Sequence, residues 1–312
     1  MKKIFLVIFV GVILFVVFYG NSSKPEIRSL GQLLLPKVFE TKETKILFVG
    51  DMFFDRYIRQ VGNSKGGDFV FSCVSDFLKD FDLVVGNLEG PITGNPSISL
   101  GTEIENPENY VFTFPPNTAK LLAKNNIKIV NLNNNHIGNF GEEGIILTKR
   151  YLGEAGIKYF DNKTIYRTKI GGIDMSFISY NEFSGESAEK VAQKIKEEKE
   201  KERMVFVYAH WGDEYSEVPN RVAKTAELFA KSGADFIVGS HPHIILPSQS
   251  FDFAQDRKTT VYYSLGNFIF DQYWNKEVST GLVLELNIKD KNITATEHYV
   301  SLNKNGQTCL VN

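Results

Sequence analysis

Five short apolar runs, separated by stretches with helical patterning, constrain the fold of this chain more than any other feature of its sequence. The runs cover residues 46–49, 83–85, 127–130, 204–208 and 236–238. The helical stretches cover residues 71–81, 118–125, 142–155, 187–203 and 221–232. Strands that alternate with helices are typical of βαβ units, in which both faces of a sheet are covered. We therefore expect an α/β domain built on a largely parallel sheet.

The C-terminal part of the chain shows a different pattern. Two further apolar runs, residues 281–288 and 293–302, lie on either side of a polar tetrapeptide at residues 289–292. This arrangement predicts an antiparallel hairpin. No domain boundary is evident after residue 45, so we expect one folded domain at residues 45–302 and a short tail at residues 303–312.

Each of the five apolar runs is followed by a polar residue that can serve as a ligand or a catalyst, usually beside a glycine. These residues are Asp51 after the first run, Asn87 and Glu89 after the second, Asn135 and His136 after the third, His210 after the fourth, and His241 and His243 after the fifth. One such residue would be ordinary turn chemistry, but five strand ends with oxygen or nitrogen donors are hard to attribute to turns alone. Ligands of open α/β sheets bind at the carboxyl ends of the strands, so the sequence predicts one shared site.

The most specific part of this site is the stretch GADFIVGSHPH at residues 233–243. Pro242 disfavours a helix at His241 and fixes its own φ angle, which predicts an extended His-Pro-His segment. Side chains at positions i and i+2 of an extended segment lie on one side. The two imidazoles can therefore serve one metal or two adjacent metals, and a pair of loop histidines without a function is the alternative.

The predicted donors combine carboxylates, amide oxygens and imidazoles, without a thiolate. This mixture suits Mn, Fe, Zn or Co, and the hard oxygen donors also allow Mg. The donors are more numerous than one tetrahedral ion needs, so we expect one or two divalent ions that activate water for hydrolysis. His136, next to Asn135, is then placed to protonate a leaving group, although a hydrogen-bonded structural histidine is the alternative.

The N-terminal residues predict a membrane anchor. Lys2 and Lys3 precede an anchor expected at residues 4–20. Its apolar run at residues 4–19 would extend roughly 24 Å as a helix, against a hydrocarbon core of ~30 Å. No small-residue cleavage pattern follows it, so we expect an uncleaved signal anchor rather than a cleaved signal peptide. The lysines predict a cytoplasmic stub at residues 1–3 and a single-pass protein of the cell membrane with an extracytoplasmic C-terminal domain. Residues 21–44, which are polar and weakly periodic, are the expected linker.

Charge and cysteine content exclude some classes of partner. The formal net charge of −2 provides no polycationic surface, so we expect no binding to nucleic acid. Cys73 and Cys309 are too few and too far apart in sequence for a disulfide framework or a zinc knuckle. Cys73 lies in an apolar stretch and is expected to be a buried thiol. Residues 94–116, a polar stretch with four prolines, are expected to form a flap or insertion beside the site.

Six segments of the chain carry motifs that follow one another in the order found in a known family. They are GDMFFDR (residues 50–56), GNLEGPIT (86–93), NNNHIGNFGEEG (133–144), AHWGDEY (209–215), GADFIVGSHPH (233–243) and YSLGNFIFDQ (263–272). In these segments the chain resembles the CapA family of poly-γ-glutamate capsule synthesis proteins, which has a calcineurin-like metallophosphoesterase architecture. The resemblance implies a metallophosphoesterase-like αββα sandwich of mixed sheets, preceded here by the membrane helix.

The resemblance also implies roles for individual residues. The implied metal ligands are Asp51, Asn87 or Glu89, Asn135, His210, His241 and His243, and His136 is the implied catalytic residue. Arg56 in the first segment, and Asn267 and Asp271 in the last, are expected to contact the substrate. Simple packing of Phe268 and Phe270 in a strand is the alternative explanation of that last segment.

Some positions depart from the metallophosphoesterase pattern. The usual Asp-x-His start reads Asp51-Met52-Phe53 here, so one expected histidine is missing. The usual bridging aspartate is Asn87, with Glu89 two residues further on. Asn133 and Asn139 replace an expected alanine and aspartate. Loss of a histidine and of a bridging carboxylate would weaken the binding of a second metal.

The resulting expectation is a membrane-anchored extracytoplasmic protein that acts in the synthesis, export or release of an anionic capsule polymer such as poly-γ-glutamate. Its expected chemistry is metal-assisted hydrolysis or transfer. One alternative is a general cell-surface metallophosphoesterase that acts on a phosphoester. The other is a metal-stabilised, non-catalytic subunit of a polymer-synthase complex, because fold similarity alone does not establish a reaction.

Overall fold

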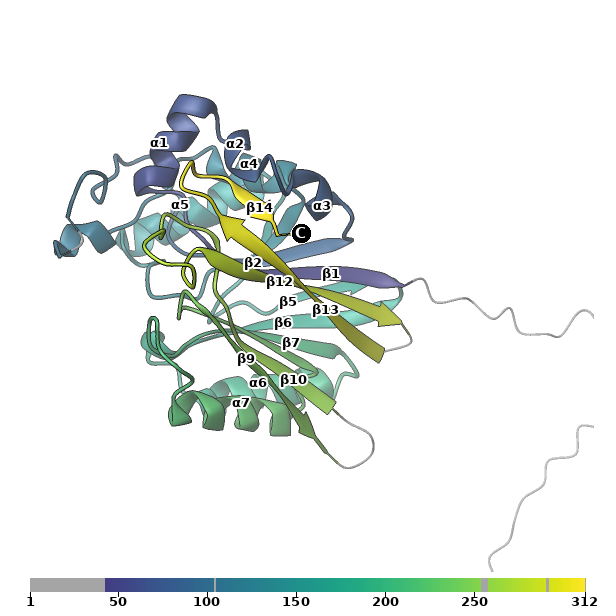
Figure 1. Cartoon of the computed structure of the whole chain (residues 1–312). Coiled ribbons are helices and arrows are strands. Elements are labelled where there is room, and N and C mark those ends of the chain that lie inside the picture. The colour runs from purple at the N-terminus through teal and green to yellow at the C-terminus, as the bar shows by residue number, and fades with distance from the viewer. Residues whose placement is uncertain (1–42, 104, 254–257, 290–291, 312) are drawn as a thin grey trace, which may run out of the picture. The chain divides into compact units, whose positions relative to one another are not determined.

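The computed structural model describes residues 43–103, 105–253, 258–289 and 292–311. Within these ranges the chain forms two mixed β-sheets with helices beside them (Figure 1). The predicted α/β class and the mixed sheets are thereby confirmed. The predicted membrane helix at residues 4–20 lies outside the described residues. Among the helices that the structure does describe, none has the length and apolar character needed to span a membrane.

The first sheet has eight strands, in the order β14-β13-β12-β1-β2-β3-β4, with β11 paired to β1 outside this path. Its strands are β1 (Thr44–Met52), β2 (Leu83–Leu88), β3 (Ile127–Asn131), β4 (Lys158–Phe160), β11 (Asn267–Ile269), β12 (Thr280–Lys289), β13 (Asn292–Leu302) and β14 (Thr308–Leu310). Strands β1 to β4 are parallel, whereas β12, β13 and β14 pair antiparallel. The β12–β13 pair confirms the predicted hairpin.

The second sheet has six strands, in the order β5-β6-β7-β8-β10-β9. Its strands are β5 (Tyr166–Ile170), β6 (Ile173–Asn181), β7 (Met204–His210), β8 (Phe236–Ser240), β9 (Ile245–Asp252) and β10 (Lys258–Leu265). The four central strands are parallel, and the two edge strands pair antiparallel with their neighbours.

The helices correspond closely to the predicted stretches, with two exceptions. They are α1 (Arg56–Lys65), α2 (Asp68–Phe71), α3 (Ser75–Lys79), α4 (Thr118–Lys124), α5 (Gly141–Glu154), α6 (Ala188–Lys199) and α7 (Asn220–Ser232), with the 3₁₀ turns η2 (Pro107–Tyr110) and η3 (Glu182–Ser184). The stretch at 71–81 is divided between α2 and α3. Helix α1 was not predicted, because its only buried residues are Ile58 and Val61 and it has no apolar run.

Alternation of side chains along each strand explains how the sheets pack. On β1, Leu47 and Val49 face the helices beside the first sheet, whereas Ile46 and Phe48 face the second sheet. The Phe48 ring lies 5.7 Å from the ring of Phe206 on β7. The opposite face of the second sheet packs on α6 and α7 (Figure 1). The sheets therefore face each other, and helices cover their outer sides.

The prediction of a single, largely parallel sheet is wrong. Strands β1, β2 and β3 belong to the first sheet, whereas β7 and β8 belong to the second. A parallel strand can be covered by helices on both faces, or by helices on one face and a second sheet on the other. Both kinds of strand are equally apolar, so the apolar runs do not show whether the strands form one sheet or two.

Strand pairing and a disulfide attach the C-terminal segment to the rest of the domain. Strand β14, within the residues expected to form a tail, pairs with β13. Cys309 on this strand forms a disulfide with Cys73, with the Cα atoms 4.7 Å apart. The prediction of a buried thiol is wrong, because Cys73 is exposed and oxidised. The two cysteines are separated by 236 positions in the sequence, so their contact forms only in the folded chain.

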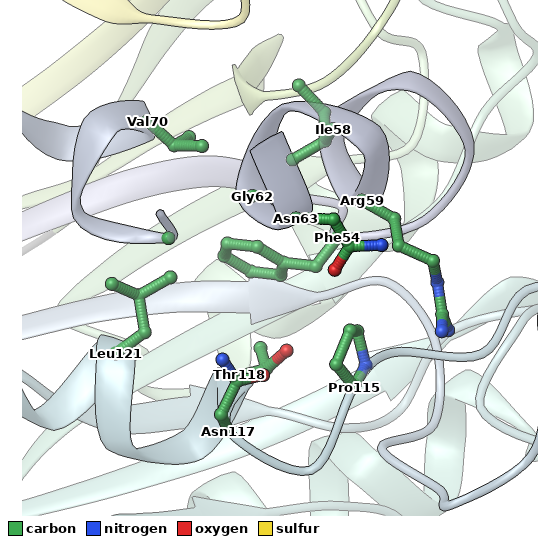
Figure 2. A pocket seen from close by; sticks show the side chains of 11 residues that line it. Phe54, Ile58, Arg59, Gly62, Asn63, Val70, Pro115, Asn117, Thr118 and Leu121 are labelled. Carbon is green, nitrogen blue, oxygen red and sulfur yellow. The ribbon is translucent and has the colours of Figure 1, made fainter. Parts of the chain in front are cut away.

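A hollow lies among α1, α2 and α4 on the helical side of the first sheet (Figure 2). Its walls include Phe54, Ile58 and Leu121, and its volume of about 40 Å³ holds a few water molecules at most. The guanidinium of Arg59 at its rim binds Asp55. None of the residues predicted from the strand ends lines this hollow, so the functional site must be sought elsewhere.

Candidate metal centre

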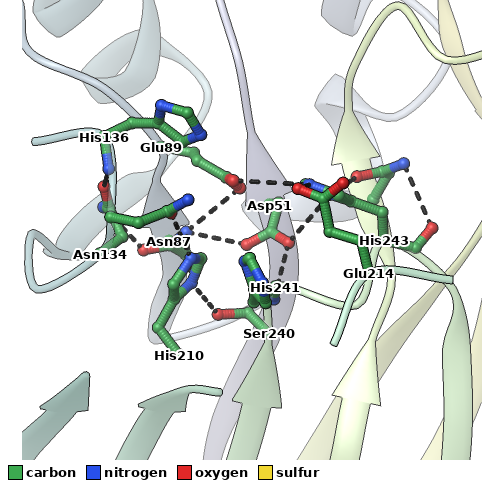
Figure 3. A network of polar contacts seen from close by, with 12 residues as sticks. Asp51, Asn87, Glu89, Asn134, His136, His210, Glu214, Ser240, His241 and His243 are labelled. Atoms are coloured by element: carbon green, nitrogen blue, oxygen red, sulfur yellow. Dashed lines mark hydrogen bonds and ion pairs between the residues drawn. The ribbon is translucent and has the colours of Figure 1, made fainter. Parts of the chain in front are cut away.

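The carboxyl ends of parallel strands from both sheets meet at one place in the structure. Asp51, Asn87 and Asn131 stand in register on β1, β2 and β3. His210 and Ser240 are paired in the same way on β7 and β8. Because the sheets face each other, these two rows of polar side chains converge (Figure 3). The residues predicted from the strand ends thus lie in one cluster.

The two sheets approach each other closely at Gly266. Strand β10 of the second sheet ends there, and the chain continues into β11, where Asn267 is the register partner of Asp51. The backbone N–H of Asp51 donates to the carbonyl of Gly266 at 3.1 Å. A Cβ atom on Gly50 would lie 1.9 Å from that carbonyl oxygen, so only glycine allows this crossing. The crossing brings Asn267 beside the strand ends.

Asp51 and Glu89 form a pair of fully buried carboxylates at the centre of the cluster. Among the described residues, their only ion-pair partner is His243, and no lysine or arginine pairs with either of them. Burial raises the pKa of Asp51 to about 6. Burial and the nearby charge of Asp51 together raise the pKa of Glu89 well above its ordinary value. Buried carboxylates without a cation are costly, so this centre is built for a positively charged group.

His241 and His243 do not form an extended segment. Their φ angles are 97° and 58°, in the left-handed region that residues other than glycine seldom adopt. The predicted extended conformation is wrong, because a tertiary contact overrides the local preference: the N–H of His241 donates to Asp51 Oδ2 at 3.1 Å. Arg56 and Tyr215, with φ of 44° and 56°, are also strained and lie nearby. Strain of this kind accumulates at functional sites.

Asn267 fixes the orientation and tautomer of His243. The Asn267 Nδ2 group lies 3.0 Å from the carbonyl of Val278 and 3.0 Å from Gln272 Oε1, so Oδ1 is the atom that faces His243. His243 Nδ1 lies 2.9 Å from this Oδ1 and must carry the proton. The lone pair of His243 Nε2 then points toward Glu89, with Oε1 at 3.6 Å. Asn267 is fully buried behind His243, rather than at a surface open to substrate.

His210 connects the second sheet to Asn135. Its Nε2 atom lies 2.9 Å from Asn135 Oδ1, and its Nδ1 atom lies 2.9 Å from the hydroxyl of Ser240. Donor atoms about 2.1 Å from a common ion lie roughly 3–4 Å from one another. The pairing of Asn135 with His210 is therefore compatible with a shared ligand sphere.

Asn134 determines which way the Asn87 amide points. Its Oδ1 atom accepts the backbone N–H groups of His136 and Ile137, at 3.1 and 2.9 Å. Its Nδ2 group is therefore the part that donates to Asn87 Oδ1, at 3.1 Å. The carbonyl oxygen of Asn87 is thus held away from the centre.

The amide NH₂ of Asn87 faces the centre instead. It donates to Asp51 Oδ1 at 2.8 Å and lies 3.5 Å from Glu89 Oε2. It also lies 3.4 Å from His210 Nδ1. Asn87 therefore orients the carboxylates and the imidazole around it, and Glu89 presents an oxygen to the centre at this end of β2.

Two groups of buried side chains have donor atoms close enough to hold one ion each. One group is Glu89, His210 and His241, and the other is Asp51, Glu89 and His243; within each group the donor atoms lie within 4.8 Å of one another. Glu89 belongs to both groups. Glu89 Oε1 and His241 Nδ1 are buried without a hydrogen-bond partner among the described residues. These donors fit a divalent metal, because they leave two buried polar atoms that no described residue satisfies by a hydrogen bond.

The histidines of the centre are in the protonation state that binds metal. Burial lowers the pKa of His210 well below its ordinary value. Burial also lowers the pKa of His241 to about 4 and that of His243 to about 3. Neutral imidazole is the form that binds a metal ion, so no proton must leave these groups at neutral pH.

His136 stands at the edge of the centre, on the loop between β3 and α5. Its ring packs on Phe112 with the centroids 4.1 Å apart, and its Nδ1 atom lies 3.2 Å from Asn139 Oδ1. Asn139 Oδ1 also accepts the backbone N–H of Phe112, so the asparagine carbonyl faces the imidazole. Burial lowers the pKa of His136 to about 4. The segment at 94–116, which supplies Phe112, therefore lies beside the site as predicted.

Arg56 and Asp271, both predicted to contact substrate, contact each other. Arg56 Nε and one terminal nitrogen donate to the two carboxylate oxygens of Asp271, at 3.0 and 2.6 Å. The other terminal nitrogen donates to Asn109 Oδ1 at 2.7 Å. Arg56 nevertheless lines a small pocket together with His136 and other residues at the centre. In this structure the guanidinium is held at the mouth of the centre by protein partners.

A cleft of about 300 Å³ with polar and apolar walls opens beside Asn135. Three consecutive asparagines, residues 133–135, form one wall. Lys149, Lys163 and the exposed ring of Phe183 are also in contact with the cleft. Phe183 packs on His241 with the ring centroids 4.4 Å apart, so one lining residue of the cleft contacts a histidine of the centre.

The sequence reasoning missed three contributors to this arrangement. Ser240 supports His210, Asn134 orients Asn87, and Glu214 lies with Oε1 3.9 Å from His243 Nε2. Each of these residues lies inside one of the six sequence motifs, so the motifs do point to the segments that contain them. Their roles could not be read there, because hydrogen-bond direction and side-chain reach depend on the tertiary arrangement.

Known bacterial proteins match most of the length of this chain. The family model described as bacterial capsule synthesis protein PGA_cap matches residues 45–272. The chain is 31% identical to the PGA biosynthesis protein CapA of Bacillus subtilis (strain 168), over 81% of this chain and 70% of that protein. It is 29% identical to the capsule biosynthesis protein CapA of Bacillus anthracis, over 85% of this chain and 68% of that protein.

Proposed function

The chain belongs to the bacterial capsule synthesis protein family PGA_cap, and from this premise we propose that it is a metal-dependent hydrolase or transferase of capsule polymer synthesis. The relatives named for PGA and capsule biosynthesis support an anionic polymer of the poly-γ-glutamate type as the substrate. The reaction is cleavage or transfer at an amide or phosphoester bond of this polymer or its precursor.

One observation carries the proposal. Two groups of donor atoms share Glu89, and their buried carboxylates have no lysine or arginine partner among the described residues. A purely structural cluster would be expected to satisfy such groups with a cation or a hydrogen bond. Two divalent ions, of Mn, Fe, Zn or Mg, would satisfy them here.

The residues around the centre have complementary tasks. A bound divalent metal supplies Lewis acidity and lowers the pKa of coordinated water. His136, held by Phe112 and Asn139 at the edge, is positioned to exchange a proton with the leaving group. The cleft beside Asn135 offers amide groups and Lys163 to a chain that carries amides and carboxylates, whereas Lys149 in the same cleft is paired with Asp161 at 2.6 Å.

An extracytoplasmic location is part of the proposal. The disulfide between Cys73 and Cys309 supports it, because such bonds persist in oxidising compartments. The predicted anchor at residues 4–20 and linker at 21–44 would hold the domain at the outer surface of the membrane. Whole cells treated with a membrane-impermeant protease should lose the domain while a cytoplasmic marker stays intact. Protection of the domain in intact cells would contradict this location.

The activity is tested with purified full-length protein loaded with Mn²⁺. Poly-γ-glutamate is followed by its length distribution, and a generic phosphodiester by release of its chromophore. We expect polymer cleavage that stops on chelation and falls at least about 100-fold in His136→Ala. His298→Ala is the matched control, because His298 pairs with Glu285 on the β12–β13 hairpin.

Two outcomes favour other functions. Turnover of the phosphodiester alone would favour a general metallophosphoesterase. A non-catalytic subunit of a polymer-synthase complex would be favoured by a different result. In that case the protein binds metal but cleaves neither substrate, and the variant in which His136 is replaced still restores capsule to a deletion strain.

A further inference from the structure

Phe53 stands where the metallophosphoesterase pattern has a metal-binding histidine. Its ring is fully buried and packs on Phe112 and Phe270, with centroid distances of 4.8 and 4.6 Å. Arg56 lies over the same ring, with its Cζ atom 4.6 Å from the centroid. No donor atom can come from this position, so the group of Asp51, Glu89 and His243 lacks a ligand on that side.

We propose that Glu214 supplies the missing ligand and completes a four-residue metal position with Asp51, Glu89 and His243. The inference rests on the proposed metal-dependent function and adds a residue that reaches the centre from the other sheet. Glu214 follows β7 of the second sheet, whereas Asp51 lies at the end of β1 and Glu89 follows β2 in the first sheet.

The distances support this assignment. His243 Nε2 lies 3.6 Å from Glu89 Oε1 and 3.9 Å from Glu214 Oε1. Both separations from His243 lie within the roughly 3–4 Å expected for two ligands of one ion. Glu214 does not belong to the two groups whose donor atoms all lie within 4.8 Å of one another, so its carboxylate must turn further toward Asp51 and Glu89 when an ion binds. Within the described part of the chain, Glu89 Oε1 is buried without a hydrogen-bond partner, and the Glu89 side chain points toward His243 and Glu214 (Figure 3). An unsatisfied buried oxygen is an independent sign that a cation belongs between them.

Two hydrogen bonds of Tyr215 hold the loop that carries Glu214 in place. The backbone N–H of Tyr215 donates to the carbonyl of Pro242 at 2.9 Å. The hydroxyl of Tyr215 accepts from Gln272 Nε2 at 2.9 Å. Tyr215 has a φ of 56°, so this placement is maintained against a local backbone preference. Glu214 is therefore positioned by its neighbour rather than by chance.

The adjacent acidic residue shows the contrast. Asp213 binds Arg221 through both carboxylate oxygens, at 2.6 and 3.1 Å, and faces solvent. Glu214 has a side chain that is 39% exposed, and its only ion-pair partner among the described residues is His243.

A position with three carboxylates and one imidazole differs from the position of Glu89, His210 and His241. Oxygen-rich sites suit Mn²⁺ or Mg²⁺, and imidazole-rich sites suit Zn²⁺ or Fe²⁺. The two halves of the centre are therefore expected to differ in metal preference. Glu214 also stands on the exposed side, where its carboxylate can exchange with an incoming ligand.

The test measures Mn²⁺ binding to the full-length protein after removal of bound metal. Isothermal titration gives the number of ions and their affinities, and electron paramagnetic resonance separates coupled pairs from isolated ions. We expect Glu214→Gln to weaken one Mn²⁺ by at least about 10- to 100-fold and to replace the coupled spectrum with that of an isolated ion. Glu217→Gln, an equal charge change on an exposed part of the same loop, should leave both ions unchanged.

The outcomes separate this inference from the proposal on which it rests. Two ions bound by Glu214→Gln with the affinities of the unmodified protein would overturn the role of Glu214 alone. An unmodified protein that binds no Mn²⁺ would overturn the metal centre as a whole. Urea unfolding of the metal-free variant should match that of the unmodified protein, which excludes a loss of fold as the cause.

Discussion

Two glutamates are almost completely buried in this domain, and their surroundings are opposite. Glu198 on α6 is 1% exposed and receives hydrogen bonds from Arg167, Lys201, Arg203 and Ser176. Glu89 is 0% exposed, and no lysine or arginine of the described chain pairs with it. The pKa of Glu198 lies below its ordinary value because of Arg167, whereas that of Glu89 lies above it because of burial.

Under the proposed function, the difference separates a carboxylate that stabilises the fold from one that binds a metal ion. A buried charge with several donors is satisfied by the chain itself. A buried charge without them remains costly until a cation arrives from outside. We infer that the fold tolerates the free-energy cost of burying Glu89 because metal binding offsets this cost.

Replacement of Glu89 should have the largest effect on function and the opposite effect on the metal-free fold. Because Glu89 belongs to both donor groups, Glu89→Gln should lower Mn²⁺ affinity and activity by more than about 100-fold, beyond the range of an outer-shell partner. Without metal, its free energy of unfolding in urea should equal or exceed that of the unmodified protein, because an unpaired buried charge is removed. A clear loss of stability in metal-free Glu89→Gln would contradict the contrast between Glu89 and Glu198.

Replacement of Glu198 should show the reverse behaviour. Glu198→Gln leaves Arg167, Lys201 and Arg203 without their carboxylate and should lower the free energy of unfolding by about 2–3 kcal/mol. The number of bound Mn²⁺ ions and their affinities should not change. Urea unfolding and calorimetric titration measure the two quantities, and altered metal binding would mean that the glutamates are coupled.

A smaller effect is expected from the residue that orients His243. Asn267→Ala removes the acceptor that keeps the proton on His243 Nδ1, so the affinity of one Mn²⁺ should fall by about 10-fold. Asn287→Ala on β12 is a suitable control, because this asparagine lies on the hairpin away from the centre. Equal affinities in Asn267→Ala and the control would show that the hydrogen bond has no influence on binding.

The dependence of stability on pH should be the smallest of these effects. The pKa of Glu198 is lower in the folded than in the unfolded chain. Its contribution is therefore complete above the unfolded value of about 4.3 and is lost as the pH falls through the folded value. The stability difference between the unmodified protein and Glu198→Gln should be largest at pH 7 and shrink toward pH 3. A difference that grows at low pH would contradict the sign of this contribution.

The sequence predicted the strand ends better than their arrangement. Asp51, His210 and His241 could be placed in one site because parallel strands align their carboxyl ends, whichever sheet contains them. The division into two sheets could not be predicted, because the apolar runs look alike in both cases. The disulfide was missed because the contact of Cys73 with Cys309 depends on the position of β14.

The same limit applies inside the site. Asn87 looked like a weakened ligand, and only the hydrogen bonds of Asn134 reveal that its NH₂ group faces the centre. Asn267 looked like a substrate contact, but it lies behind His243. Sequence motifs identify which residues gather at a site, whereas the direction of each polar atom follows from neighbours that the motif does not specify.

Anomalous diffraction from crystals of the protein soaked in Mn²⁺ tests the central claim most directly. The account predicts two maxima that share Glu89, one beside His210 and His241 and the other beside Asp51, His243 and Glu214. The absence of any maximum in contact with Glu89 would contradict it, because the buried carboxylate would then have no cation to satisfy it.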